Sequence, residues 1–245
     1  MARQPRELSD SGYMHVIVRG IGRQLLFEAE EDYAFYLGSL ERYAKALEVT
    51  VCTYCLMENH VHLLLYDKEK RLPVLMKKLG VRYSWYFNQK YERTGHLFQD
   101  RYRSEMVEDD AYLLTVFRYI LRNPEKAGIC RASEYRWSSY TSYGDKKSFV
   151  DTGVLEGYIR NEAEYTAWIA EPTDDECMEY IPPKRDDAWA LKVIHKQLKG
   201  KSGTALQDMD RPERDEALRK LKKAGLTVRQ IERLTGINRG IVQKA

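Results

Sequence analysis

The sequence has no apolar run long enough to cross a membrane as a helix, although it is 245 residues long. Its N-terminus also lacks the apolar core of a secretory signal peptide. Cysteine is scarce, with four residues, which is typical of a chain kept in a reducing compartment. We therefore expect a soluble, cytoplasmic protein with no membrane partner. The 43% of hydrophobic residues is enough to build a substantial core.

The few cysteines give little sign of metal or redox chemistry. Cys52 and Cys55 have the Cys-x-x-Cys spacing of zinc and redox motifs, but no second pair follows them. They fall in a segment with strand character, where odd spacing would direct the two thiols to opposite faces. We therefore do not expect this pair to hold a metal.

A large excess of one charge is absent from the whole chain, but the charge is unevenly distributed. The total is +3, whereas residues 1–150 carry +3, residues 151–190 carry −8 and residues 191–245 carry +8. This pattern predicts a main domain, an acidic connector and a basic helical region that binds nucleic acid. The simpler alternative is a solvated acidic surface followed by an ordinary pair of basic helices.

Two histidines stand at the head of an apolar run, at His60 and His62. Side chains two apart on a strand point to the same face, so these imidazoles would project side by side while Val61 points to the core. Neutral imidazole is a common ligand of divalent metals. The alternative is that the two histidines form a half-exposed polar face without a metal.

The order of predicted elements indicates an α+β domain. Hydrophobic spacing predicts strands at 12–20, 49–57, 60–65 and 101–107, and helices at 29–47, 72–91 and 109–123. The order β-α-β-β-α-β, followed by a helix, is the ferredoxin-like split βαβ pattern with an antiparallel sheet. In that fold the His60 strand is internal, and the last helix lies against or beside the sheet.

The helix after residue 109 carries a candidate nucleophile. Tyr119 and Asn123 are four residues apart and so lie on one side of the helix, whose last turn is closed by Pro124. Tyrosine can act as a covalent nucleophile, but its pKa near 10 requires help from a cation at neutral pH. Tyr112 is the alternative nucleophile on nearly the same helix face. We rank it lower, because only Tyr119 has Asn123 one turn later.

The C-terminal part, about residues 214–245, has the pattern of a helix-turn-helix. Thr227 begins a capping box, and Thr235-Gly236 separates two short helices. Three arginines remain on the outside and favour DNA binding, namely Arg229, Arg233 and Arg239. The alternative is a plain αα-hairpin used for packing.

Three separated motifs resemble those of single-tyrosine HUH transposases, closest to the REP-associated, insertion-sequence-200-like branch. MENHVHLLL at residues 57–65 resembles the His-hydrophobe-His motif. FRYILRNPEKAG at residues 117–128 resembles the family's tyrosine motif, and GHLFQDRYRS at residues 95–104 resembles the segment that precedes that helix. The resemblance covers about residues 12–145.

The resemblance implies a DNA transposase that acts on single-stranded or hairpin DNA. Tyr119 would attack a phosphodiester and form a 5′-phosphotyrosine link, while His60, His62 and Asn123 would hold Mg²⁺ or Mn²⁺. It leaves open whether each site is built within one chain or shared across a homodimer. Further arginines are candidates for phosphate contacts by charge and location, namely Arg19, Arg82, Arg101 and Arg103.

Two other functions fit parts of the same pattern. A relaxase-like or replication-initiator-like nicking enzyme would use the same motifs to cut DNA without completing transposition. A non-catalytic regulator would bind DNA through the helix-turn-helix alone, and the intact set of His60, His62, Tyr119 and Asn123 argues against it. The acidic connector and the helix-turn-helix depart from the minimal family pattern.

Overall fold

The computed structural model describes residues 9–172, 177–178, 187–198 and 200–245. The chain divides into two compact units, with the boundary after residue 180. Within the described ranges, no helix combines the length and apolar character that a membrane span requires. Each unit has its own buried core and is described by itself.

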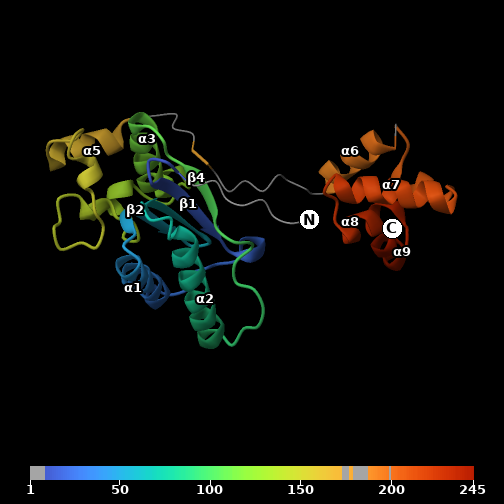
Figure 1. The fold of residues 1–245 in the computed structure, drawn as a ribbon, viewed down its shortest axis with the longest axis horizontal. Coiled ribbons are helices and arrows are strands. Elements are labelled where there is room, and N and C mark those ends of the chain that lie inside the picture. The colour runs from blue at the N-terminus through green and yellow to red at the C-terminus, as the bar shows by residue number, and fades with distance from the viewer. Residues whose placement is uncertain (1–8, 173–176, 179–186, 199) are drawn as a thin grey trace. The chain divides into compact units, whose positions relative to one another are not determined.

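The first unit is built on a four-stranded antiparallel sheet in the order β2-β3-β1-β4 (Figure 1). The strands are β1 (Tyr13–Arg19), β2 (Thr50–Met57), β3 (His60–Tyr66) and β4 (Arg103–Met106). The two-residue turn Glu58-Asn59 joins β2 to β3, and Met57 pairs with His60 at its base. β3 and β1 are therefore the internal strands, as the sequence predicts for the His60 strand.

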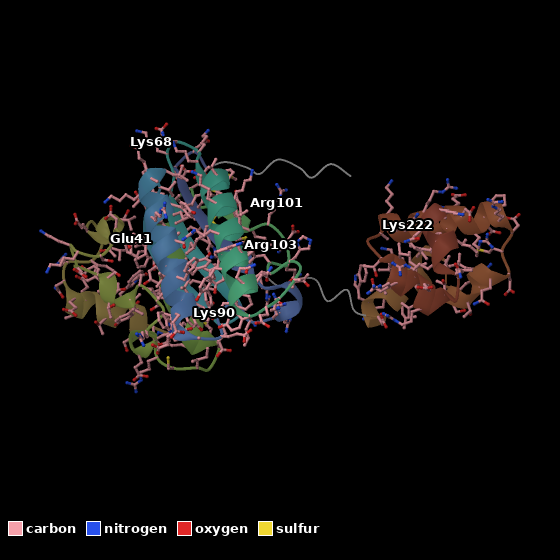
Figure 2. All side chains as sticks on the ribbon, turned by 90° about the horizontal axis from the view of Figure 1, so that it is seen from below. Glu41, Lys68, Lys90, Arg101, Arg103 and Lys222 are labelled. Carbon is pink, nitrogen blue, oxygen red and sulfur yellow. The ribbon has the colours of Figure 1, made fainter. Side chains whose placement is uncertain are left out.

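Helices cover both faces of this sheet. The helices are α1 (Glu30–Ala46), α2 (Leu72–Lys90), α3 (Asp110–Leu121), α4 (Asn123–Lys126) and α5 (Glu162–Ala170). Figure 2 shows α1 and α2 side by side over one face, where they bury the larger core cluster. α3 packs on the opposite face with a second cluster. The predicted α+β class is therefore confirmed.

Alternation along β3 divides its side chains between these two cores. Val61, Leu63 and Leu65 are fully buried on the α1 and α2 side, whereas Leu64 belongs to the cluster under α3. His60 and His62 share the face of Leu64, because residues two apart on a strand point the same way. The strand is thus anchored by aliphatic side chains while it presents two imidazoles toward α3.

The expectation that Cys52 and Cys55 point to opposite faces is wrong. Both are buried in the cluster under α3. The cause is a register shift between Val51 and Thr53, which resets the alternation of β2 between the two cysteines. Sequence periodicity alone does not reveal such an irregularity.

The first part of the acidic segment 151–190 packs onto the first unit. Tyr165 and Ile169 of α5 are buried beside α3, together with Leu155 and Ile159. The acidic residues of this stretch occupy outward positions, so its net charge conceals an apolar side. Within the segment, residues 173–176 and 179–186 lie outside the described part of the chain.

The second unit is a small helical domain around an aliphatic core. Its helices are α6 (Asp187–Gln197), α7 (Arg211–Lys223), α8 (Val228–Thr235) and α9 (Arg239–Lys244). Thr227 and Gln230 form the predicted capping box at the start of α8. α8 ends at Gly236, whose φ of 72° is the left-handed conformation that glycine adopts most easily.

We predict that Leu63→Ala lowers the free energy of unfolding by about 2–5 kcal/mol, because Leu63 is fully buried and truncation leaves a cavity. Val81→Ala is the control, since Val81 is 65% exposed and the change should stay within about 0.5 kcal/mol. Urea unfolding at pH 7 measures both variants. Equal effects of the two substitutions would contradict the described core.

Candidate active site

Three histidines meet on the sheet face that α3 covers. His60 and His62 come from β3, and their ring centroids are 5.0 Å apart. His15 comes from the neighbouring strand β1, and its Nε2 lies 3.2 Å from Nδ1 of His62. His15 and His62 are almost completely buried, whereas His60 is half-buried. The predicted pair is thus part of a cluster of three imidazoles.

α3 brings Tyr119 to this cluster. The centroid of its ring lies 5.8 Å from that of His62 and 6.0 Å from that of His15, in edge-on contacts. The Tyr119 side chain is buried, with 2% of the residue exposed. The alternative nucleophile Tyr112 is engaged elsewhere, because its hydroxyl donates to Oε2 of Glu105 at 2.7 Å.

Asn123 is joined to Tyr119 through the backbone. α3 ends at Leu121, and Asn123 begins the short helix α4 rather than ending the longer helix as the sequence suggests. Its Nδ2 still donates to the carbonyl oxygen of Tyr119 at 2.9 Å. The Asn123 side chain also interacts with His60.

Burial keeps the β3 imidazoles neutral at pH 7. Desolvation lowers the pKa of His60 to about 4, with a further lowering by the nearby charge of Arg19. The pKa of His62 lies well below its ordinary value, first because of burial and then because of the neighbouring imidazoles and cations. Neutral imidazoles are the form that binds a metal.

The turn before β3 orients His60. Nδ1 of His60 lies 2.7 Å from Oδ1 of Asn59, while Nδ2 of Asn59 donates to the carbonyl oxygen of Arg23. Because Oδ1 can only accept, Nδ1 of His60 carries the proton and Nε2 keeps its lone pair. The Nε2 lone pair of His60 is therefore available to a cation or to a hydrogen-bond donor.

Two basic side chains add positive charge to the site. Lys126 Nζ lies 4.2 Å from the centroid of the Tyr119 ring, and Arg19 pairs with His60 across β1 and β3. These charges favour an anionic ligand such as a DNA phosphate and oppose a metal ion. Glu105, which faces His15 from β4, supplies negative charge on the same face.

The donor set of this site is two imidazoles and one amide. Across the described ranges, no three histidine, cysteine, aspartate or glutamate side chains are grouped as metal ligands. The predicted ligands His60, His62 and Asn123 do not count as such a group, because asparagine is not one of these four residue types. Such a set leaves open positions for phosphate oxygen and water.

The arginines predicted in the first unit are not all at this site. Arg19 and Arg103 lie on the same face of the sheet as His62. Ile17 of β1 pairs with His62 on one side and with Arg103 on the other, and Arg19 is two residues after Ile17. Arg82 belongs to α2 on the other face, where its guanidinium stacks on the ring of Phe35. Arg101 lines a cavity of about 550 Å³ beside α2, and Figure 2 shows it near Arg103 at the edge of the unit.

The C-terminal arginines differ in their surroundings. Arg229 and Arg239 are exposed on α8 and α9. Arg233 is exposed as well, but Nη2 lies 2.5 Å from a carboxylate oxygen of Asp187. Its charge is therefore already partly balanced within the second unit.

Sequence reasoning gave little weight to three residues of the site: His15, Glu105 and Lys126. His15 falls in the strand predicted at 12–20, where it shares a face with Ile17, and the sequence offers no other signal for its position. The pairing of β1 with β3 and β4, which brings the three strands into register, is not visible in the sequence. Lys126 lies seven residues after Tyr119, within the predicted tyrosine motif.

Comparison with known proteins supports the family that these motifs predict. The family model described as "Transposase IS200 like" matches residues 9–123, just under half of the chain. The matched part resembles this family and contains His60, His62, Tyr119 and Asn123, whereas Lys126 lies just after it. No curated protein matches the sequence significantly.

Two solved structures match this chain at low identity. One is described as a REP-associated tyrosine transposase bound to a REP hairpin, with 13% identity, a TM-score of 0.48, and 73% of this chain and 99% of that chain covered. The other, from Deinococcus radiodurans R1, is described as a candidate transposase, with 17% identity and a TM-score of 0.35. It covers 46% of this chain and 91% of its own.

We predict that the metal-free protein loses stability as the pH falls from 7 to 5. Unfolded His60 takes up a proton near its ordinary pKa of 6.5, whereas folded His60 does so only at about 4. Protonation therefore favours the unfolded state in this window, by about 2 kcal/mol at pH 5 for His60 alone. The lowered pKa values of His15 and His62 act in the same direction.

Urea unfolding at pH 7 and pH 5 in the presence of a chelator measures this effect. His60→Gln should reduce the loss of stability, and His96→Gln should not, because His96 is exposed in a loop. An unchanged pH dependence in His60→Gln would show that His60 is not held neutral by the fold.

Proposed function

We propose that this chain is a single-tyrosine DNA strand transferase that cleaves and rejoins single-stranded DNA at hairpin-associated sites. The observation that carries the proposal is the meeting of Tyr119 with the neutral imidazoles of His60 and His62 on one sheet face. The match of residues 9–123 to the transposase family model supports the proposal. The hairpin preference follows from the resemblance of the motifs.

In the proposed reaction, the Tyr119 oxygen attacks a DNA phosphorus atom. Tyr119 loses its hydroxyl proton as the 5′-phosphotyrosine bond forms. The bond between phosphorus and the 3′ oxygen breaks, and that oxygen takes up a proton and leaves as a 3′-hydroxyl. A second 3′-hydroxyl then attacks the phosphotyrosine, releases Tyr119 and rejoins the strands. Each step exchanges one phosphate ester for another, so no external energy source is needed.

His60, His62 and Asn123 would hold a divalent ion, for which we propose Mg²⁺ or Mn²⁺. When bound, the ion would polarise the phosphate and stabilise negative charge on its oxygens. Imidazole nitrogen suits Mn²⁺ better than Mg²⁺, which prefers a shell of oxygen ligands. We therefore expect tighter binding of Mn²⁺.

The buried position of Tyr119 makes Lys126 part of the proposal. A phosphate can reach a residue that is 2% exposed only if a covering group moves. The Lys126 ammonium lies over the Tyr119 ring and is attracted to phosphate. We propose that DNA draws the Lys126 side chain away from the ring and opens the approach to the phenol.

We infer that the first unit is a ferredoxin-like split βαβ domain and that α8 and α9 form a helix-turn-helix. The element order β1-α1-β2-β3-α2-β4 supports the first inference. Two short helices separated by a left-handed Gly236 support the second. We further propose a main domain at about residues 1–150, an acidic segment at 151–190 whose first part packs onto that domain, and a basic DNA-binding region at 191–245.

Two alternatives use parts of the same structure. A relaxase-like nicking enzyme would form the same tyrosine adduct but would not rejoin the strands. A non-catalytic regulator would bind DNA through α8 and α9 and would form no adduct. A homodimer that shares its active sites is compatible with the proposal and would not change the chemistry.

We predict that the full-length protein forms a covalent adduct with hairpin-bearing single-stranded DNA in the presence of Mn²⁺ or Mg²⁺. Tyr119→Phe should abolish the adduct on a denaturing gel, because the substitution removes only the attacking oxygen. Tyr112→Phe is the matched control on the same helix and should keep it. An adduct that persists in Tyr119→Phe would refute the nucleophile, and no adduct with any tested hairpin would favour the regulator.

We predict that Arg229→Ala and Arg239→Ala weaken binding of the full-length protein to duplex DNA. Each substitution should lower the slope of log K against log salt by about 1, because one phosphate contact is lost. Arg233→Ala is the internal comparison and should have a smaller effect, since Arg233 is paired with Asp187. Unchanged affinity and slope in all three variants would favour the packing role of these helices.

A further inference from the structure

A row of polar side chains crosses the sheet behind the proposed metal site. Glu105 of β4 pairs with His15 of β1, and His15 lies diagonally next to His62 of β3. His15 is fully buried. Nδ1 of His15 lies 3.7 Å from Oε2 of Glu105, and its Nε2 lies 3.2 Å from Nδ1 of His62. His15 therefore faces a carboxylate on one side, beyond hydrogen-bond length from Nδ1, and contacts a candidate ligand on the other.

These contacts determine which nitrogen of each ring carries the proton. Oε2 of Glu105 is an acceptor held in place by two donors, the Tyr112 hydroxyl at 2.7 Å and the Met178 amide at 3.3 Å. A lone pair on Nδ1 of His15 would face this carboxylate unfavourably, so the proton of neutral His15 belongs on Nδ1. Nε2 of His15 is then an acceptor, and Nδ1 of His62 must donate to it.

We propose that Glu105 and His15 are positioning residues that hold His62 in its Nδ1–H form, with the Nε2 lone pair directed into the site. The part of this inference that concerns a cation rests on the proposed function, whereas the protonation pattern stands without it. Asn59 imposes the same Nδ1–H form on His60. Both β3 imidazoles would therefore present Nε2, each fixed by a different partner.

The surroundings of the row distinguish positioning from simple packing. Apolar, buried side chains such as Leu64 and Ile120 lie in the same layer as His15. A buried imidazole in such a layer is unfavourable unless it makes polar contacts, so an aliphatic residue would fill the position of His15 at less cost. Outer partners that orient a metal-binding histidine typically change metal affinity by about 10–100-fold.

The first test is the protonation pattern of His62 in the metal-free, full-length protein at pH 7. Long-range ¹H–¹⁵N spectra of histidine-labelled protein distinguish a protonated from an unprotonated ring nitrogen, and single His→Gln variants assign the five histidines. We expect a proton on Nδ1 and none on Nε2 of His62. A proton on Nε2, or an equal mixture of the two forms, would overturn the proposal.

Substitutions test whether Glu105 and His15 cause this pattern. His15→Phe and Glu105→Leu should convert His62 to a mixture of forms, whereas Glu105→Gln should retain the pattern because it keeps an acceptor oxygen. His96→Phe, on an exposed loop, is the control. An unchanged His62 pattern in His15→Phe, with the amide spectrum of a folded protein, would refute the positioning role.

Binding of Mn²⁺ alone, measured by titration without DNA, provides the second readout. His15→Phe should weaken it by about 10–100-fold, and Glu105→Gln should restore most of the affinity that Glu105→Leu loses. Equal Mn²⁺ affinity in wild type and His15→Phe would refute the link to the cation. The spectra remain informative even if the protein cleaves no DNA, so failure of this inference is separable from failure of the proposed function.

Discussion

The site depends on the alternation of side chains along β3. Its aliphatic residues, fully buried under α1 and α2, fix the strand in the sheet and leave it little freedom to rotate or slip. A slip of one residue would turn His60 and His62 into the aliphatic core under α1 and α2 and direct the apolar set toward α3. The same packing that stabilises the fold thus determines where the two imidazoles point. α3 then needs only to pack on the opposite face to bring Tyr119 to them.

This face combines neutral imidazoles, which can bind a metal ion, with basic side chains, which attract phosphate. The combination suits a metal-assisted reaction on DNA. Burial keeps His60 and His62 neutral, and Asn59 on one ring and His15 on the other occupy Nδ1. Arg19 and Lys126 attract phosphate but repel a free cation. A divalent ion and a DNA phosphate would therefore stabilise each other in the site, since each offsets the charge that disfavours the other. The site would therefore bind the divalent ion and the phosphate together better than it would bind either one alone.

Much of this arrangement could be predicted from the sequence, because it rests on local periodicity. The strands, the main helices and the shared face of His60 and His62 follow from spacing, and the match of residues 9–123 to the family supports the motif reading. Long-range pairing was beyond such reasoning. Strand pairing determines the contact of His15 with His62 and Glu105, and it includes the register shift that places Cys52 and Cys55 on one face.

The packing of α5 was concealed because its acidic residues dominate the composition of that segment. The burial of Tyr119 was not foreseen either, since it depends on how α3 packs against the sheet.

The central claim is that one cation, bound by two imidazoles, lies close enough to Tyr119 for both to engage the same phosphate. Anomalous diffraction from crystals soaked in Mn²⁺ tests this most directly. The account predicts a manganese peak within about 2.0–2.3 Å of Nε2 of both His60 and His62, distances typical of first-row metals bound to imidazole. A peak at Nδ1 of either ring, or manganese bound elsewhere in the molecule with none between these two histidines, would contradict it.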